Sequence, residues 1–367
     1  MRRSRTDWDR GQQDGYERGW RHGYHLGRCK GIMSRIPEDR KRREIRVLYV
    51  SSGLWSYRPL DSGITEELEA VCAEVRVALP TDPVADIAKA YRPDLVLSLN
   101  SVELLKVHII DEIRAMGILT AVWFTDDPYY SDVTVDIAKH YDYVFTLEMN
   151  SVPLYRQAGC RHVYYLPFGV NRSLFHPQPA SPEHSVDVIF IGSAFRNRVA
   201  FFDEIAPELS SMNLLIAGYW WDRLQHYDVL QSKIRTGYWI SPEESARYYS
   251  SAKIVINMHR AIDDETNRNS SGIQAESINP RTFEISACAP LQLTDVRANL
   301  SAMYRSGLDI ATYDSPQELV RQIQYYLGHE EQRQEIAWRG LERTMREHTY
   351  RTRIQRMFEP IYDGHSE

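Results

Sequence analysis

Short apolar runs rich in β-branched residues alternate with helix-length segments along the chain from residue 44 onward. In the first half the runs are "EIRVLYV" (44–50), "EVRVALP" (74–80), "DLVLSLN" (94–100), "LTAVWF" (119–124) and "YVFTLE" (143–148). This alternation is typical of parallel strands whose sheet is covered by helices. The pattern predicts a Rossmann-like α/β domain over residues 44–170.

A second series of the same kind follows a linker, "YYLPFGVNRSLFHP" (164–177), that is punctuated by proline and glycine. Its runs are "VDVIFIGS" (186–193), "NLLIAGYW" (213–220), "KIVINMH" (253–259), "APLQLTD" (289–295) and "LDIATY" (308–313). We therefore expect a second Rossmann-like domain over residues 171–347. A final helix over 348–367 is expected to return to the first domain.

The first 43 residues form a separate basic extension with an internal repeat. Glycine recurs at every fourth position, and aromatic residues follow three of the glycines. On a helix this spacing gives a groove without side chains beside a ridge of aromatic side chains. Six glycines would leave an isolated helix only marginally stable. Two interpretations remain open: a helix that needs a partner, which includes self-association through residues 11–31, or a flexible leader. The repeat positions are Gly11, Gly15, Gly19, Gly23, Gly27 and Gly31, followed by Tyr16, Trp20 and Tyr24.

Composition narrows the class of protein. A chain of 367 residues with 43% hydrophobic and 26% charged residues is typical of a globular protein of two domains. Residues 1–46 hold 14 Lys and Arg against 7 Asp and Glu, which leaves 30 against 43 for the remainder. An acidic body argues against a nucleic-acid enzyme. No apolar run is long enough to span a membrane, so a cytoplasmic protein without a transmembrane segment is expected.

The four cysteines are scattered and show neither a CxxC pair nor zinc-ligand spacing, which predicts reduced thiols and no metal site. They are Cys29, Cys72, Cys160 and Cys288.

Parallel α/β sheets bind ligands beyond the carboxyl ends of their strands, so chemistry is sought in those loops. The loop after the first run, "SSGLWSYRPLDSG", lacks the GxGxxG pattern of dinucleotide-binding enzymes. After the fourth run, Asp126 and Asp127 are candidates to hold an acceptor hydroxyl or to take its proton. The alternative is an Asx turn or helix cap before Pro128.

In the second domain, Gly192 and Ser193 form a strand-to-helix turn, and Arg196 and Arg198 follow at the start of the helix. A glycine turn lets backbone N–H groups approach an anion, and guanidinium groups pair well with phosphate. A solvated surface position is the competing interpretation of both arginines. Gly218 ends the next strand-like run and is expected to belong to the same site.

Another strand end carries His259 and Arg260, followed by a long polar loop that is expected to be functional or mobile. His259 is a candidate catalytic residue and Arg260 a candidate ligand for the donor. A histidine whose hydrogen bonds are satisfied within the protein is the alternative.

The segment "NPRTFEISACAPLQLTD" (279–295) predicts a helix that starts at a ligand. Asn279 is a good N-cap and Pro280 a good first residue. The free N–H groups of the first turn, which includes Thr282, attract a phosphate, and Arg281 adds positive charge. Glu284 lies one turn further, where a carboxylate accepts hydrogen bonds from a ribose diol. A salt bridge between Arg281 and Glu284 is the alternative.

The order of several segments resembles the CgeB-like spore maturation family of glycosyltransferases, also called the YkvP/CgeB type. The resemblance covers residues 45–362, and residues 257–295 are its most specific part. The segments are "LPFGVNRSLFHP", "VDVIFIGSAFRNR", "LLIAG", "YYSSAKIVINMHR", "NSSGIQAESINPRTFEISACAPLQLTD" and "EHTYRTR".

The resemblance implies a GT-B fold, in which two Rossmann-like domains face a cleft. It also implies a nucleotide-diphosphate sugar donor held mainly by the second domain and an acceptor held by the first. Glu284 takes the place of the second glutamate of a Glu-x7-Glu signature, and Glu276 that of the first. Arg196 and Arg198 fall near the residues that hold the diphosphate in such enzymes. The usual lysine partner is not evident, and Ala289 replaces a family-like glycine.

The functional prediction is therefore transfer of a sugar from a nucleotide-diphosphate donor to an unknown acceptor, in spore maturation or surface glycosylation. We expect neither a cofactor nor a metal ion. The arginines and the N-terminal end of the helix are expected to bind the phosphates of the donor. The configuration of the product, retained or inverted, stays open. The alternatives are a non-catalytic spore-associated protein that keeps the fold and binds a glycan, and an epimerase on the same plan. The expected location is cytoplasmic. The alternative is association with the spore on the mother-cell side, with residues 11–31 in contact with a spore layer.

Overall fold

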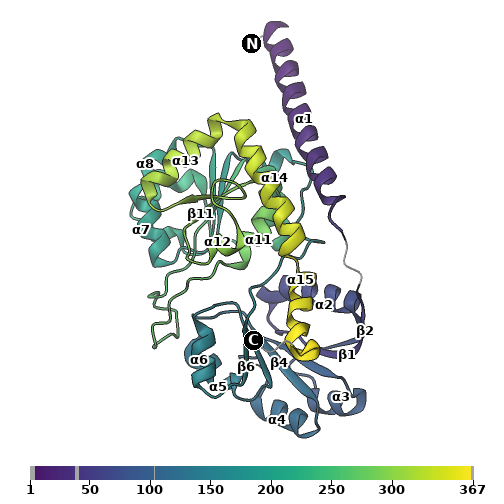
Figure 1. Cartoon of the computed structure of the whole chain (residues 1–367). Helices are drawn as coiled ribbons and strands as arrows, with labels where there is room; N and C mark the ends of the chain where they lie inside the picture. The colour runs from purple at the N-terminus through teal and green to yellow at the C-terminus, as the bar shows by residue number, and fades with distance from the viewer. Residues whose placement is uncertain (1–4, 38–40, 103, 365–367) are drawn as a thin grey trace.

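The computed structural model describes residues 5–37, 41–102 and 104–364. The chain forms two α/β domains, one above the other in Figure 1, and a long helix projects from the upper one. Each domain contains a parallel sheet of six strands. The prediction of two Rossmann-like α/β domains with an N-terminal extension is confirmed.

The first sheet has the strand order β2-β1-β3-β4-β5-β6, and all its neighbours are parallel. Its strands are β1 Arg43–Val50, β2 Cys72–Ala78, β3 Leu95–Leu99, β4 Leu119–Phe124, β5 Tyr143–Thr146 and β6 His162–Tyr165. Its connections contain η1 Trp55–Tyr57, α2 Arg58–Val71, α3 Val84–Tyr91, α4 Val107–Ala115, α5 Ser131–Ala138 and α6 Ser151–Gln157.

The second sheet has the order β12-β11-β10-β7-β8-β9 and is likewise parallel. Its strands are β7 Val188–Ile191, β8 Leu214–Gly218, β9 Ile234–Thr236, β10 Ile254–Asn257, β11 Leu291–Asp295 and β12 Ala311–Tyr313. A short helical turn, η2 Pro182–His184, precedes β7. The helical segments between the strands are α7 Arg196–Glu204, α8 Ala206–Ser210, η3 Trp221–Arg223, α9 Tyr227–Leu230, η4 Gln231–Lys233, α10 Pro242–Ser251, α11 Pro280–Ala287 and α12 Leu300–Met303.

Two edge strands, β6 and β9, were not predicted as strands. The sequence analysis assigned "YYLPFG" to the linker, but residues 162–165 extend the first sheet beyond β5. β9 is three residues long and pairs only with β8. Such short runs carry little periodicity, and an edge strand is stabilised by the neighbour it meets in three dimensions.

After the second sheet the chain is helical, with α13 Pro316–Gly328, α14 Glu330–Glu347, α15 Tyr350–Phe358 and a terminal π-helical turn over 359–363. α15 leaves the second domain and packs against α2 of the first domain (Figure 1). Where the outgoing and returning chains cross, Val170 N–H donates to the His348 carbonyl at 2.8 Å. Arg351 of α15 then pairs with Glu67 of α2 at 2.6 Å.

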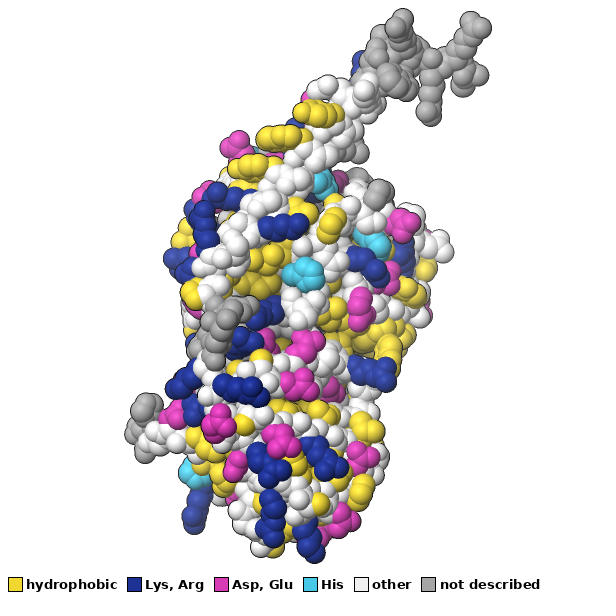
Figure 2. All heavy atoms as spheres, turned by 90° about the vertical axis from the view of Figure 1, so that its right-hand side faces the viewer, with side chains coloured by type: hydrophobic (Ala, Val, Ile, Leu, Met, Phe, Trp, Pro, Cys, Tyr) yellow, Lys and Arg dark blue, Asp and Glu magenta, His cyan; other side chains and the backbone are white. Residues whose placement is uncertain are grey.

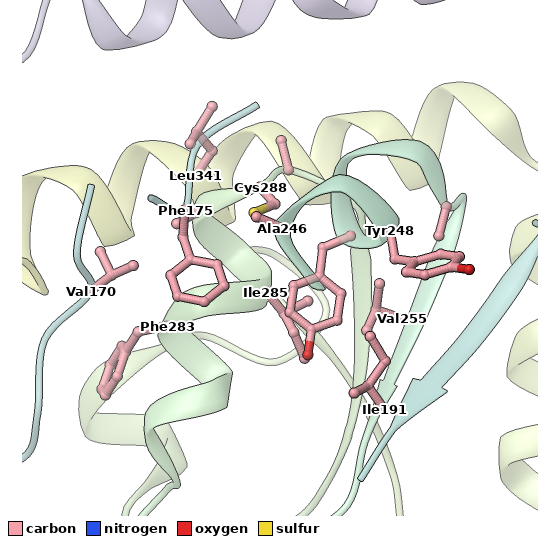
Figure 3. Close-up of a cluster of buried hydrophobic side chains, with 14 of the residues drawn as sticks. Val170, Phe175, Ile191, Ala246, Tyr248, Val255, Phe283, Ile285, Cys288 and Leu341 are labelled. Carbon is pink, nitrogen blue, oxygen red and sulfur yellow. The ribbon is translucent and has the colours of Figure 1, made fainter. Parts of the chain in front are cut away.

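α11 shows how packing orients the functional side chains. Phe283, Ile285 and Cys288 lie in a buried hydrophobic cluster of the second domain (Figure 3). This cluster fixes one face of α11 against the core, since buried apolar surface is the dominant stabilising contribution. Arg281 and Glu284 belong to the first turn and a half of this anchored helix, and both line the cavity between the domains.

The N-terminal extension is a 29-residue helix, α1 Arg5–Met33. Of the two interpretations that the repeat allowed, the structure shows the helix. Its second half packs on α14, where Cys29 is fully buried and the Trp338 indole N–H donates to His25 Nδ1 at 3.1 Å. Its first half projects past the second domain (Figure 1). Among the described helices, none is long and apolar enough to cross a membrane.

Candidate functional site

A cavity of about 360 Å³ lies between the two domains, at the carboxyl ends of both sheets. Ligands of parallel α/β sheets bind at this end of the strands. The first domain contributes Ser56, Tyr57, Pro59, Leu60, Thr125, Tyr129 and Phe168. The linker and the second domain contribute Phe175, Ile191, Gly192, Ser193, Arg198, Gly218, Tyr219, Tyr238, Trp239, Ile240, Pro242, Ser245, Tyr249, Arg260, Asn279, Pro280, Arg281 and Glu284.

The start of α11 is held in place at the cavity wall. Asn279 Oδ1 accepts the N–H of Thr282 at 3.0 Å, which makes Asn279 the N-cap. The N–H of Asn279 itself donates to His259 Nε2 at 3.0 Å, and His259 Nδ1 lies 2.6 Å from Asp295 Oδ1. This chain of hydrogen bonds fixes the helix end. Because Pro280 has no N–H and the N–H of Thr282 is capped, the N–H of Arg281 is the one that the first turn leaves for a ligand among the described residues.

Arg281 and Glu284 face the cavity without forming an ion pair with each other, so the predicted alternative of a mutual salt bridge is not observed. Arg281 lies beside the hydroxyl of Tyr249. The Glu284 carboxylate has no hydrogen-bond or ion-pair partner among the residues that the structure describes. Burial raises the pKa of Glu284, although the positive charge of Arg281 opposes this effect. Hydroxyl donors of a bound ligand would relieve the cost of this buried carboxylate.

The glycine turn after β7 also lines the cavity. Gly218 has φ +144°, and a Cβ atom there would lie 2.3 Å from the Gly192 carbonyl oxygen, so two strand ends approach each other as only glycine permits. Arg198 is buried behind this turn and donates to the carbonyls of Ser193 at 2.9 Å and Met258 at 2.6 Å. Burial, with the nearby charge of Arg281, lowers the pKa of Arg198 to about 9.

Arg260 lies at the cavity between two aromatic rings. Its guanidinium is 4.5 Å from the ring centre of Phe195 and 5.0 Å from that of Tyr129, and it also pairs with Thr266. Tyr129 belongs to the first domain, and its hydroxyl donates to the Arg260 carbonyl at 3.1 Å. Arg260 therefore places positive charge where the two domains meet.

Three predicted donor-binding side chains lie away from the cavity. Arg196 is exposed and pairs with Glu265, a residue of the long polar loop. Glu276 precedes α11 and is not among the described residues that line the cavity. Thr282 is fully buried beneath the helix start, where its hydroxyl donates to Asn279 Oδ1 and accepts from Asn257 Nδ2. The structure gives Thr282 a supporting position rather than one in contact with a ligand.

The two aspartates after β4 have different environments. Asp127 is buried and accepts hydrogen bonds from the hydroxyls of Thr134, Thr146 and Tyr155 at 2.6–3.1 Å. Asp126 lies directly behind the cavity wall, where its Oδ2 accepts from the hydroxyls of Thr125 at 2.7 Å and of Tyr57. Asp127 is held by its hydrogen bonds and is not among the described residues that line the cavity, so its catalytic role stays a prediction.

His259, the third predicted catalytic residue, is likewise not among the described residues that line the cavity. Its ring is buried, and both nitrogens are occupied by Asp295 and by the Asn279 N–H. Because Nε2 must accept, the ring is the neutral tautomer with the proton on Nδ1. Burial lowers the pKa of His259 and so favours this neutral state.

The sequence analysis missed the aromatic residues of the cavity. Tyr57, Tyr238 and Trp239 line it from loops after β1 and β9, and Trp239 lies 5.2 Å from Trp55 of the first domain, ring centre to ring centre. Large aromatic side chains in loops at strand ends were visible in the sequence. Their convergence from both domains was not, because it depends on how the domains face each other.

A second cavity, of about 370 Å³, lies at the opposite end of the second sheet, beneath α1. Its charged side chains pair within the chain: Lys253 with Asp187 at 2.7 Å, and Arg21 with Glu330 at 3.0 Å. This cavity lies at the amino ends of the strands, so it is not the expected ligand site of this fold. Over the described ranges, no group of three or more His, Cys, Asp or Glu side chains is arranged to hold a metal ion.

Comparison with solved structures defines the class of the fold. The chain superposes on sucrose-phosphate synthase from Thermosynechococcus elongatus with a TM-score of 0.58 and 12% identity, covering 88% of this chain and 100% of that one. It superposes on Anabaena Alr3699/HepE, solved in complex with UDP and glucose, with a TM-score of 0.57 and 12% identity, covering 87% and 100%. These similarities show that the fold is that of GT-B glycosyltransferases.

Sequence comparisons are more specific. Residues 196–359 match the family described as "Glycosyl transferase-like". The chain is also similar to "Spore protein CgeB" of Bacillus subtilis (strain 168), with 29% identity over 319 residues that cover 83% of this chain and 95% of that protein. The predicted resemblance, to CgeB and to glycosyl transferase-like proteins, is confirmed.

Proposed function

We propose that this protein transfers a sugar from a nucleotide-diphosphate donor to an acceptor bound by the first domain. The observation that carries the proposal is the helix start at Asn279, which brings Arg281 and an unpartnered Glu284 carboxylate into a cavity shared by both domains. A diphosphate next to a ribose presents the complementary groups, namely negative oxygens and a neutral diol. The similarity to a spore protein supports a role in spore maturation or surface glycosylation.

The donor phosphates lie at the first turn of α11 in this proposal. The Arg281 N–H and the dipole of the helix, together with the charges of Arg281, Arg198 and Arg260, compensate the charge that develops on the leaving nucleoside diphosphate. Gly192 and Ser193 line the same cavity, although the Gly192 N–H is already donated to the Ala217 carbonyl at 2.8 Å. The ribose hydroxyls donate to Glu284. We propose transfer without a metal ion, so added EDTA should leave the rate unchanged.

The acceptor enters from the first domain, where Tyr57 and Thr125 line the cavity in front of Asp126. Asp126 acts through these two hydroxyls in this proposal, and orients an acceptor hydroxyl or takes its proton. The stereochemical outcome of transfer is left to product analysis.

A thermal-shift panel of UDP-, GDP-, ADP- and dTDP-sugars tests donor binding. A ligand at 100 times its Kd adds about 2.7 kcal/mol to the free energy of unfolding, so the correct donor should raise Tm clearly. Arg281→Ala should abolish the shift. Arg339→Ala is the matched control, because Arg339 pairs with Glu335 on the surface of α14 and should leave the shift intact.

The panel also separates the alternatives. If no nucleotide sugar raises Tm, the non-catalytic glycan-binding alternative gains support and the proposed donor site is wrong. If a donor binds, incubation with candidate acceptors followed by mass spectrometry of the products distinguishes transfer from epimerisation and from hydrolysis.

A further inference from the structure

The projecting half of α1 has no role in the proposed donor site. The side-chain hydrogen bonds, ion pairs and ring contacts that join this helix to the rest of the described chain begin at Arg21, which pairs with Glu330 at 3.0 Å. Residues 5–20 precede that point and would extend about 24 Å at the rise of an α-helix. A free helix with glycine at three of these positions is marginal on its own, since each glycine costs about 1 kcal/mol relative to alanine.

The projecting helix exposes aromatic side chains. The aromatic row, Tyr16, Trp20 and Tyr24, is 70%, 61% and 52% exposed. Trp20 stacks on Tyr24 with ring centres 5.6 Å apart, so the row is ordered as a ridge before any partner arrives. Figure 2 shows hydrophobic side chains in a row along the projecting helix, next to a white band without large side chains.

A shallow groove runs beside this ridge. It is formed by the glycine row, Gly15, Gly19 and Gly23, at each of which an added Cβ would meet no atom within 4 Å. Because residues four apart on a helix lie on neighbouring turns of one face, the ridge and the groove follow each other along α1. Near Gly19 and Gly23 the surface is hollowed further against residues 179–185 of the second domain.

We propose that α1 pairs with α1 of a second copy of this chain, antiparallel and about a two-fold axis near Gly19 and Trp20. In this register each aromatic residue of the row lies opposite a glycine. Tyr16 meets the partner's Gly23, Trp20 meets the partner's Gly19, and Tyr24 meets the partner's Gly15. Ridge and groove are thus self-complementary, as an isologous two-fold interface requires.

The charges along α1 select the antiparallel direction. Residues 10–17 contain two acidic side chains against one Arg, whereas residues 19–33 contain three Arg and Lys and no acidic residue. An antiparallel pair places each acidic half beside the partner's basic half, and a parallel pair would place like charges together. The same direction puts the two domain bodies at opposite ends of the paired helices.

Analytical ultracentrifugation of the full chain at low salt tests the proposal. We expect a reversible dimer that weakens as salt rises, because the exposed charges are screened. Trp20→Ala should weaken the dimer by at least about tenfold, as expected for an aromatic residue at the centre of an interface. A chain that stays monomeric at every concentration would overturn the proposal.

Glycine variants separate packing from helix stability. Gly23→Leu and Gly11→Leu both raise helix propensity, yet only Gly23 lies in the proposed groove, because Gly11 is about 120° further round the helix. Gly23→Leu should therefore dissociate the dimer, while Gly11→Leu should preserve or strengthen it. Equal effects of the two variants would contradict the register.

Cysteine cross-linking tests the direction. The four native cysteines are buried, so an introduced cysteine is the reactive one. Gly19→Cys lies near the proposed two-fold axis and should form a disulfide-linked dimer under mild oxidation. Gly11→Cys should not, because its own counterpart lies far along the partner helix; cross-linking of both variants would indicate a parallel pair.

Discussion

At the residue scale, Glu284 is the side chain whose environment points most directly to a ligand. Its carboxylate is partly buried, lacks a partner within the described chain, and has a raised pKa because of that burial. The neighbouring Arg281 lowers this cost but does not form an ion pair with it. A carboxylate held in this way is suited to accept hydrogen bonds from a diol.

We expect Glu284→Gln to fold normally and to bind the donor about two- to thirtyfold more weakly, because a hydrogen bond to a charged acceptor is worth about 1.5–3 kcal/mol and one to a neutral acceptor about 1 kcal/mol. Isothermal titration with the donor identified by thermal shift measures the change. Glu335→Gln, on the surface of α14, is the control. Unchanged donor affinity in Glu284→Gln would remove the ribose assignment.

Asp127 yields a prediction about stability. Burial raises its pKa to about 6 from 3.8, against the opposing hydrogen bonds of Thr146, Tyr155 and Thr134. A raised folded-state pKa means that its favourable contribution is complete below about pH 4 and is lost as pH rises through 6. Two pKa units correspond to about 3 kcal/mol.

The pH dependence of the unfolding free energy, measured by urea denaturation, checks this expectation. Between pH 4 and pH 7, wild type should lose about 3 kcal/mol relative to Asp127→Asn, which cannot titrate. Asp142→Asn, a carboxylate hydrogen-bonded to the N–H of Thr120, is the comparison. Parallel curves for wild type and Asp127→Asn would show that Asp127 is not buried as described.

Residue roles were the least predictable part of the site. The pattern placed Arg196 and Arg198 at one helix start, but only the structure shows that Glu265 engages the first and two carbonyls the second. The sequence likewise indicated no partner for His259, whereas the structure pairs its ring with Asp295, 36 positions later in the chain. These partners are distant in sequence, and local spacing says nothing about them.

At the element scale, α11 was predicted closely from its own residues. Asn279 and Pro280 determine where the helix starts, and both signals are local. Asn279 caps the helix with its side chain, and Pro280 suits the first helical position because it has no N–H that would remain unsatisfied there. The long apolar strands were predicted for the same reason. β6 and β9 were missed because short edge strands depend on partners that the local pattern does not identify.

Asn279→Ala should affect both the stability and the site. Loss of the cap costs about 1 kcal/mol, and the freed helix end should also weaken donor binding. Ser315→Ala is the matched control, since Ser315 caps α13 far from the cavity by accepting the Glu318 N–H. Denaturation should show a loss for both variants, larger for Asn279→Ala because the Asn279 side chain also exchanges hydrogen bonds with Asn257. Thermal shift with donor should fall only for Asn279→Ala. An equal fall in both would mean that α11 does not present the donor site.

At the scale of the whole molecule, the long polar loop before α11 ties the two domains together. Asp132 at the start of α5 accepts from the N–H and the hydroxyl of Ser270 at 3.0 and 2.7 Å. The buried Glu148, which follows β5, accepts the N–H of Ser277 at 3.0 Å. These contacts hold the loop that leads into Asn279 against the first domain. The loop thereby couples the orientation of the domains to the position of the helix start.

Removing the contacts of the polar loop with the first domain should make the relative orientation of the two domains more variable without unfolding either domain. In Asp132→Ala/Glu148→Ala, Ser277 loses the acceptor of its buried N–H, at a cost of about 1–3 kcal/mol. We expect small-angle scattering to report a larger radius of gyration. Donor Kd should rise in inverse proportion to the fraction of molecules that keep the binding geometry.

Asp142→Ala removes a carboxylate whose hydrogen bonds stay within the first domain, to Thr120 and Arg114, so it controls for loss of charge alone. That variant should lose stability but keep the scattering profile of wild type. If the double variant also keeps that profile, the linker and α15 are sufficient to orient the domains. The polar loop would then serve only to position α11. A double variant with weaker donor affinity but an unchanged radius of gyration would show that role.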